Sequence, residues 1–376
     1  MEVNQRPPRI KILSYHNVIV PSKSARSLNA IWTSVDLSRI GEVFCYANKG
    51  TEKLDFKTLY GVNISDYPSF HLKLTKFKHK GFSGIEKRIN ILKDIITSEN
   101  SKIITYVSQA RPLRYLLFLK KLGFKIKTVL EVHSEKEPWD NTIFQEVNGI
   151  IFTSKSLMDH LTKKFSIPYG IQKRVLYHRI RKPLVTEMHD PIINKHDYCI
   201  GYIGGLELWK GVDTIVEAVR YLPSNVKALF IGGKEGNADY KRLISKAKEL
   251  EVENRIQFKG YIPYEILGKF VNDIDVFVLP LLEHIEGSIP LKLFDYMYFR
   301  KPIVASNQES IREVLKNGIT SLFFSPGSAK ELAEQIKMLI ENPSLGYNLS
   351  LNAYKSLESY TVNKWLEEME SFLEKI

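Results

Sequence analysis

The sequence has 376 residues, of which 44% are hydrophobic and 26% are charged, a composition typical of soluble globular proteins. This length favours two domains, each with enough chain for a buried core. No apolar run approaches the roughly 18 residues of a membrane span, and residues 1–9 lack the apolar stretch of a signal peptide. Two cysteines, Cys45 and Cys199, make no disulfide framework, so we expect a reducing, cytoplasmic compartment.

Positive charge is concentrated in the first half of the chain. The net charge is +12, but residues 1–190 carry 32 Lys and Arg against 17 Asp and Glu, and the remainder is slightly acidic. A one-sided basic excess favours contact of that half with an anionic partner, although a solvated basic surface is the ordinary alternative. Nucleic acid is disfavoured as this partner, because aromatic residues are not interleaved with the basic ones along a strand.

Strands and helices alternate along the first half. The predicted strands are 9–15, 41–46, 102–107, 127–132 and 150–154. The predicted helices are 27–40, 85–98, 112–122 and 156–165. This alternation predicts an α/β fold with a doubly wound parallel sheet. The turn after the first strand lacks the glycine fingerprint of dinucleotide-binding enzymes.

The alternation starts again after a polar stretch with two prolines at 181–195, which we predict to be an interdomain linker. The predicted strands of the second half are 198–203, 226–231, 256–258, 275–279 and 303–305. Its predicted helices are 211–222, 238–250, 263–271, 309–316 and 329–340, with two terminal helices from 344 and 361. We therefore predict domains at 1–190 and 191–355, followed by a last helical segment at 356–376.

The densest group of candidate site residues lies within 280–306. A short apolar strand ends at its start, and small residues at 287–288 turn the chain. Pro290 stands where a helix can begin, because the missing N–H of proline is harmless there. The N–H groups of residues 291–293 would then point out of the helix start and form a site for anions. Asp295, one turn deeper, is placed to accept hydrogen bonds from a ribose attached to a bound phosphate.

Two more segments place site-forming residues after predicted strands. Gly204 and Gly205 would let the backbone approach a phosphate closely, and Lys210 adds a point charge before the next helix. His133 stands at the carboxyl end of its strand, the edge where α/β sheets place their ligands. A surface or capping histidine is the ordinary alternative for such a position.

The sequence Gly-Ser-Ile-Pro-Leu-Lys-Leu-Phe-Asp-Tyr-Met at 287–297, followed by Lys-Pro-Ile-Val-Ala at 301–305, resembles the donor-site signature of family-four retaining glycosyltransferases of the GT-B fold. In that family two glutamates eight positions apart frame the motif. Asp295 takes the place of the second, which binds ribose. Gly287 takes the place of the first, which contacts the donor sugar, and Glu286 stands one residue earlier.

The same resemblance extends to other segments. Glu131-Val-His133 is similar to a Glu-x-His of the family, in which the histidine faces the donor sugar. The family holds the diphosphate with an Arg and a Lys five residues apart. Lys210 matches the Lys, while Gly205 takes the place of the Arg, and Lys292 is our candidate for the missing charge.

The segment Gly260-Tyr261-Ile262 resembles the family's loop against the nucleotide base. As a whole, the resemblance implies the GT-B fold: two Rossmann-like parallel-sheet domains that face a central cleft, with the last helix crossing back to the first domain. It implies a retaining glycosyltransferase that moves a sugar from a UDP- or GDP-linked donor to a glycan, lipid-linked or other acceptor, as in cell-envelope or polysaccharide biosynthesis.

We therefore expect catalytic roles for His133, Lys210 and Glu286. The expected donor-binding residues are Gly204, Gly205, Lys210, Tyr261, Ile262, Ser288, Leu291, Lys292 and Asp295. No cofactor and no metal site are expected, since acidic and histidine residues are not clustered with metal-ligand spacing.

Two other functions stay open. A non-catalytic GT-B-fold binding protein is favoured slightly by the missing Arg and Glu, and a GT-B sugar-nucleotide epimerase would need further acid–base carboxylates that the sequence does not identify. The anionic partner of the first half would be a phosphate-bearing acceptor or the inner face of a membrane. The helix region 111–127 is basic and amphipathic, which suits a membrane surface, although packing on its own sheet is the commoner role.

Overall fold

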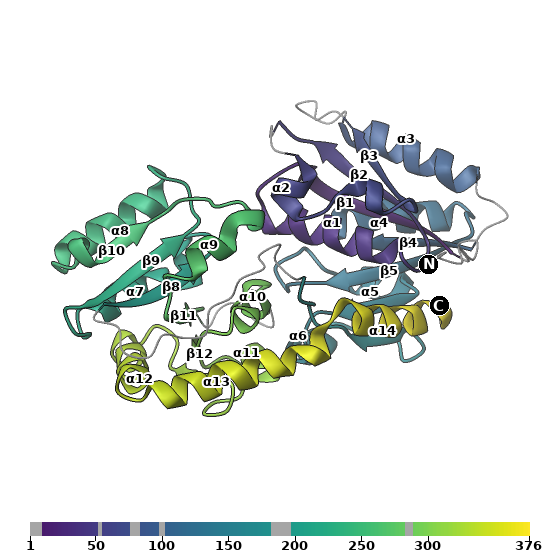
Figure 1. Ribbon diagram of the computed structural model, residues 1–376. Coiled ribbons are helices and arrows are strands. Elements are labelled where there is room, and N and C mark those ends of the chain that lie inside the picture. The colour runs from purple at the N-terminus through teal and green to yellow at the C-terminus, as the bar shows by residue number, and fades with distance from the viewer. Residues whose placement is uncertain (1–9, 52–54, 76–82, 98–101, 182–196, 283–288) are drawn as a thin grey trace, which may run out of the picture. The chain divides into compact units, whose positions relative to one another are not determined.

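The computed structural model describes residues 10–51, 55–75, 83–97, 102–181, 197–282 and 289–376 (Figure 1). The chain divides into two compact units. The first comprises Met1–Tyr177 and Val362–Ile376, and the second comprises His178–Thr361. The sequence had placed these boundaries at 190 and 355. Most of the predicted linker lies outside the described residues.

The first unit is built on a seven-stranded parallel sheet with the order β3-β2-β1-β4-β5-β6-β7. Its strands are β1 (Lys11–Val20), β2 (Glu42–Lys49), β3 (Phe70–Thr75), β4 (Ile103–Val107), β5 (Ile126–Val132), β6 (Gly149–Phe152) and β7 (Gln172–Val175). The central strands read as continuous apolar runs because helices cover both faces of the sheet; β4, for example, is buried along its whole length.

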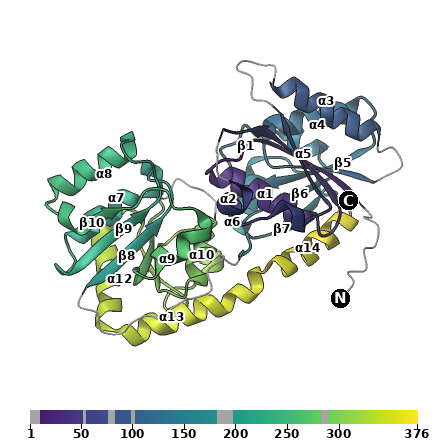
Figure 2. The ribbon, with the colours of Figure 1, turned by 45° about the horizontal axis from the view of Figure 1, so that its top comes forward.

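Helices from four segments pack into one core on one face of this sheet: α3 (Ser83–Ile96), α4 (Ala110–Lys121), α5 (Asn141–Glu146) and α6 (Lys155–Lys164). On the other face lie α1 (Ala25–Leu37) and α14 (Val362–Glu374), and the short α2 (Phe56–Tyr60) packs beside α1 (Figure 2). Capping serines mark helix starts: Ser24 accepts from the N–H of Ser27, and Ser154 from that of Leu157.

The last helix, α14, belongs to the first unit although the helix before it belongs to the second. Lys102 Nζ donates to the carbonyl of Leu373 at 3.0 Å, and Arg174 pairs with Glu368 at 3.1 Å. The absence of a side chain at Gly149 leaves room for Phe372. The prediction that the last helix crosses back to the first domain is therefore confirmed.

The second unit contains a six-stranded parallel sheet with the order β10-β9-β8-β11-β12-β13. Its strands are β8 (Tyr198–Ile203), β9 (Val226–Ile231), β10 (Ile256–Phe258), β11 (Val276–Leu279), β12 (Ile303–Ser306) and β13 (Leu322–Phe324). Both sheets have the doubly wound order, in which the chain returns to the middle and continues to the opposite edge. Such sheets bind ligands at the carboxyl ends of the strands where the order reverses, here between β1 and β4 and between β8 and β11.

Three helices of the second unit share a core on one face of its sheet: α7 (Val212–Val219), α8 (Ala238–Glu249) and α12 (Ala329–Glu341). On the other face, Tyr296 of α10 (Lys292–Tyr298) stacks on Phe277 of β11, with ring centroids 4.1 Å apart. The remaining helices are α9 (Leu267–Val271), α11 (Glu309–Val314) and α13 (Pro343–Ser356). The predicted architecture of two Rossmann-like parallel-sheet domains is confirmed.

Candidate functional site

Two glycines begin the loop that follows β8, and the charged ends of two side chains lie against them. Gly204 has φ 144°, a conformation that other residues rarely adopt, and a Cβ atom there would clash with Nζ of Lys292. A Cβ atom on Gly205 would clash with the carboxylate of Glu207. The predicted glycine pair is therefore needed to bring one cation and one anion against the backbone of the loop.

The same loop ends at the sheet's switch point. Gly211 has φ 70° and connects the turn Leu208–Lys210 to α7. A Cβ atom on Gly211 would overlap the carbonyl of Pro280, the residue after β11. The backbone segments that follow β8 and β11 are thus in direct contact, at the edge where doubly wound sheets bind their ligands.

Lys292, the first residue of α10, extends its ammonium toward the glycine loop. Its Nζ donates to the hydroxyl of Tyr202 at 2.8 Å and lies 3.9 Å from the centroid of that ring. The Tyr202 hydroxyl in turn donates to the carbonyl of Gly205 at 2.8 Å. One tyrosine therefore connects the cation of α10 to the loop after β8.

Burial holds the pKa of Lys292 well below its usual range, and the neighbouring charge of Lys210 lowers it further. Glu207 and Asp295 act in the opposite direction. Lys210 itself lies 3.6 Å from Glu207 Oε2 and 4.6 Å from the ring centroid of Trp209. An anion that binds between the two lysines would stabilise the charged form of Lys292, so binding and protonation support each other.

Asp295 lies on the same face of α10 as Lys292, one turn along the helix. Tyr264 places its hydroxyl 3.1 Å from Asp295 Oδ1 and donates toward the carbonyl of Arg181 at 2.8 Å. Burial raises the pKa of Asp295 to about 7, against the lowering effects of Tyr264 and Lys292. A carboxyl group with this pKa accepts hydrogen bonds fully only above neutral pH.

The start of α10 differs from the prediction. The helix begins at Lys292 rather than at Pro290, and the N–H of Leu293 donates to the carbonyl of Pro290 at 3.0 Å. Leu293 therefore offers no free N–H to an anion, because a tight first turn uses it. Leu291 and Lys292 stay as predicted contacts. Glu286 and Ser288 lie outside the described residues.

Backbone hydrogen bonds join the loops at the carboxyl edge of this sheet. The N–H of Gly204 donates to the carbonyl of Ile231 at 2.8 Å, and the N–H of Gly232 donates to that of Gly260 at 2.6 Å. The half-buried residues Tyr261 and Ile262 follow directly. The structure thus brings the predicted base-contacting loop to the same edge as the glycine pair.

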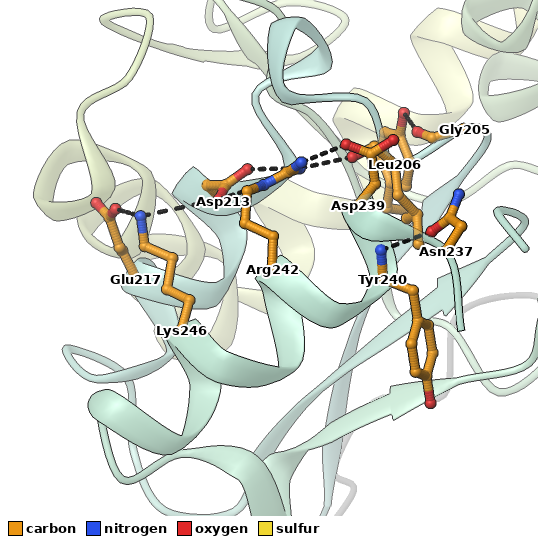
Figure 3. Close-up of polar contacts among 10 residues, drawn as sticks. Gly205, Leu206, Asp213, Glu217, Asn237, Asp239, Tyr240, Arg242 and Lys246 are labelled. Carbon is orange, nitrogen blue, oxygen red and sulfur yellow. Dashed lines mark hydrogen bonds and ion pairs between the residues drawn. The ribbon is translucent and has the colours of Figure 1, made fainter. Parts of the chain in front are cut away.

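Arg242 of α8 supports the glycine loop from outside (Figure 3). Its Nη2 donates to the carbonyl of Leu206 at 2.7 Å, and its Nε and Nη2 donate to Asp213 at 3.2 and 3.1 Å. Its Nη1 pairs with Asp239. These contacts join the loop after β8 to the first turns of α7 and α8. Sequence reasoning missed this residue, since no local spacing connects Arg242 to Leu206.

The first unit places a second polar group at the carboxyl edge of its own sheet. His133 Nε2 donates to Glu131 Oε2 at 2.9 Å, and the Glu131 side chain is almost fully buried. Asn29 of α1 lies 3.4 Å from the same nitrogen. His16, which the sequence reasoning missed, is buried nearby and contacts Ser14 Oγ through Nε2 at 2.7 Å; burial lowers its pKa to about 4.

The described residues contain neither a cluster of metal ligands nor a membrane-spanning helix. No group of three His, Cys, Asp or Glu side chains in this part of the chain is arranged to hold a metal ion. Within the same residues, every helix is too short or too polar to cross a bilayer.

The sequence of the second unit resembles known transferases. Residues 186–356 match the family model for glycosyl transferases group 1. An uncharacterised glycosyltransferase of Methanocaldococcus jannaschii is 24% identical over 62% of this chain and 60% of its own length. The capsular polysaccharide biosynthesis glycosyltransferase CapM of Staphylococcus aureus is 26% identical over 50% of this chain and 48% of its own. The chain thus spans less than two thirds of either relative.

The structural similarity covers nearly the whole chain. The Anabaena protein HepE, solved in complex with UDP-glucose, superimposes with a TM-score of 0.75 and 17% identity, over 97% of this chain and 100% of that one. The chain has the GT-B fold. The residues that match the model for glycosyl transferases group 1 lie within the second unit. This unit also contains the glycine loop, Lys210, Lys292 and Asp295.

Proposed function

We propose that the protein is a retaining glycosyltransferase that moves a sugar from a UDP- or GDP-linked donor to a glycan or lipid-linked acceptor. The observation that carries this proposal is the convergence of a glycine pair, Lys210 and Lys292 at one sheet edge, with the Asp295 carboxyl group one helical turn away. The group 1 match and the UDP-glucose complex of HepE support the same donor chemistry. The name of CapM supports a polysaccharide acceptor.

The proposed chemistry depends on charge that develops on the leaving diphosphate. Lys210 and Lys292 would stabilise this charge at fixed positions, which lowers the energy of the transition state more than that of the bound donor. Asp295 would accept hydrogen bonds from the ribose. His133, oriented by Glu131, would contact the donor sugar. Glu286 is proposed to contact a sugar hydroxyl.

We propose further that the donor binds without a divalent metal, because lysine side chains supply the positive charge. Calorimetry with UDP and GDP in EDTA, and again with Mg²⁺ or Mn²⁺, tests this directly. Binding of one nucleotide in EDTA is the expected result. Lys210→Ala should weaken the binding of that nucleotide much more than the binding of its nucleoside, which lacks the phosphates. Loss of binding on chelation would refute metal independence.

A panel of UDP- and GDP-sugars tests the enzymatic function. We expect one donor to be consumed, by slow hydrolysis alone or by transfer to an added alkyl glycoside, and NMR of the first product should show the donor's anomeric configuration. Binding of a nucleotide with no turnover of any donor would favour the non-catalytic alternative. An inverted anomer would refute retention.

We also propose that the α3–α4 side of the first unit contacts an anionic membrane that carries the acceptor. Large apolar side chains are exposed on both helices and just after α4: Ile89 by 46%, Ile96 by 49%, Phe118 by 54% and Leu122 by 59%. The two helices are in contact, since Tyr115 donates to the carbonyl of Arg88 at 2.9 Å. An apolar face with basic residues around it suits the surface of an anionic bilayer.

Acidic residues neutralise part of the positive charge near this face. Arg114 pairs with Asp140 at 2.8 Å, and Lys121 pairs with Glu146 at 2.7 Å, so apolar contact should contribute to binding in addition to charge. Sedimentation with neutral and anionic vesicles, at about 0.05 and 0.5 M salt, should show anionic binding that weakens with salt. Phe118→Ser should reduce it further. Equal partitioning under all conditions would leave the basic surface as a solubility feature.

A further inference from the structure

Glu207 places a negative charge where the donor's diphosphate is proposed to bind. It precedes the turn Leu208–Lys210, and its side chain is 48% exposed. Its Oε2 lies 3.6 Å from Lys210 Nζ, and its carboxylate lies close against the backbone of Gly205. The side chain makes no capping hydrogen bond to the turn that it precedes. The carboxylate therefore lies between Lys210 and the room left by the missing side chain of Gly205.

A second lysine lies on the neighbouring glycine. The ammonium of Lys292 lies against Gly204, as the carboxylate of Glu207 lies against Gly205. The arrangement is an anionic group with two oxygens, held at a glycine loop beside two lysines. A phosphate bound to this loop would have the same charge neighbours.

We propose that Glu207 is an internal competitor of the donor's diphosphate. In the free protein its carboxylate takes the place of a phosphate oxygen pair beside Lys210, and it must turn away when the diphosphate binds. This inference rests on the proposed function, because it concerns the same loop. It assigns to Glu207 a role that weakens the binding of the diphosphate product and thereby favours its release.

The displacement of Glu207 is physically inexpensive. Exposed ion pairs with Lys are weak, with an effect of about two- to fivefold on an equilibrium constant. A half-exposed side chain can also rotate into water without leaving a buried group unpaired. A carboxylate that stayed in place would repel the phosphates, so the cost of binding should grow with the negative charge of the ligand.

Glu207→Gln removes the charge and keeps the shape of the side chain. We expect UDP or GDP, whichever the wild-type protein binds, to bind about two- to fivefold tighter to this variant at low salt. The corresponding nucleoside should bind equally to both proteins, because it carries no phosphate. The gain should shrink at about 0.5 M salt, where the screening length falls severalfold. It should also shrink in a Lys210→Met background, since the competition acts at that lysine.

Asp197→Asn is the matched control. Asp197 also pairs with a lysine, at 2.9 Å from Lys227, but it precedes β8, at the opposite end of the strand from the glycine loop. The same change of charge there should leave nucleotide affinity unaltered. Unchanged or weaker binding of the diphosphate by Glu207→Gln would overturn the inference, and weaker binding would indicate that Glu207 holds the lysines in place. If the wild-type protein binds neither nucleotide, the proposed function fails instead.

Discussion

The ammonium of Lys292 and the hydroxyl of Tyr202 are 2.8 Å apart, although the two residues belong to different elements of the second unit. Tyr202 also donates to the carbonyl of Gly205, so helix α10 and the glycine loop are positioned by one shared side chain. Position 205, where the resembling family has an arginine, carries no side chain here. The geometry therefore supports Lys292 as the second cation of the proposed diphosphate site.

Lys292→Met tests this role, because methionine keeps most of the length of the side chain and its contact with the Tyr202 ring but loses the charge. We expect the diphosphate to bind about 10- to 150-fold more weakly, the usual effect of removing one charge-assisted contact. The nucleoside should bind as before. Calorimetry with both ligands measures the difference, and Lys227→Met at the other end of the sheet is the control. An equal loss for nucleoside and diphosphate would show that the substitution had disturbed the whole site.

Asp295 should make the second unit less stable as the pH rises. Its pKa is raised to about 7 in the folded protein, from an ordinary value near 3.8, so the folded state binds the proton more tightly than the unfolded state does. The resulting stabilisation is fully present below about pH 4 and is lost as the pH rises through 7. Asp295→Asn avoids the buried charge, and its side-chain amide can keep a hydrogen bond with the Tyr264 hydroxyl.

We expect the free energy of unfolding of Asp295→Asn, relative to that of the wild type, to rise by about 4 kcal/mol between pH 4 and pH 8. Denaturant unfolding at the two pH values measures it. The same variant should bind both nucleoside and diphosphate more weakly at pH 8, since the ribose is common to both. A stability difference that does not change with pH would contradict the raised pKa.

The strands that sequence reasoning missed all lie at sheet edges. β3 and β7 end the first sheet, and β13 ends the second. The sequences of β3 and β7, Phe-His-Leu-Lys-Leu-Thr and Gln-Lys-Arg-Val, contain charged or polar residues because an edge strand faces solvent along one side. The buried central strands were predicted correctly, since coverage on both faces forces a continuous apolar run.

Local pattern predicted the glycine loop, Lys210 and Asp295, because each stands within a few residues of a strand end or helix start. It could not predict the side chains that orient them. Tyr202, Tyr264 and Arg242 reach their partners across long stretches of chain, and no spacing in the sequence marks such contacts. The sequence shows Glu207 three residues before Lys210. Its effect on diphosphate binding depends on where its carboxylate lies, and the sequence does not give that position.

His133 gives a test in the first unit. We expect His133→Ala to keep its melting temperature and to lower sugar transfer at least about 100-fold, the scale of losing one positioned transition-state contact. Glu131→Gln should lower sugar transfer less than His133→Ala does. The amide oxygen of the glutamine can still accept the hydrogen bond from His133 Nε2, but this bond is weaker without the negative charge of the carboxylate. The rate of donor consumption measures both. Wild-type turnover in His133→Ala would remove this residue from the site.

Arg242 should affect diphosphate binding without touching the ligand. Its guanidinium joins the carbonyl of Leu206 to Asp213 and Asp239, and so holds the glycine loop against two helix starts (Figure 3). Arg242→Met leaves these acceptors without their donor, which should cost about 1–3 kcal/mol of stability. The loop would then no longer be fixed, so diphosphate affinity should fall severalfold while nucleoside affinity changes little.

Two further variants separate this positioning role from simple loss of stability. Arg242→Lys keeps the charge, but an ammonium lacks the planar fork needed to bond Asp213 through two nitrogens and Leu206 together, so stability should recover more than affinity does. Arg255 donates to the carbonyls of Val226 and Pro223, away from the glycine loop. Arg255→Met should therefore lose stability without losing diphosphate affinity. If Arg255→Met weakens diphosphate binding as much as Arg242→Met does, Arg242 acts through general stability. Its proposed role in positioning the glycine loop is then refuted.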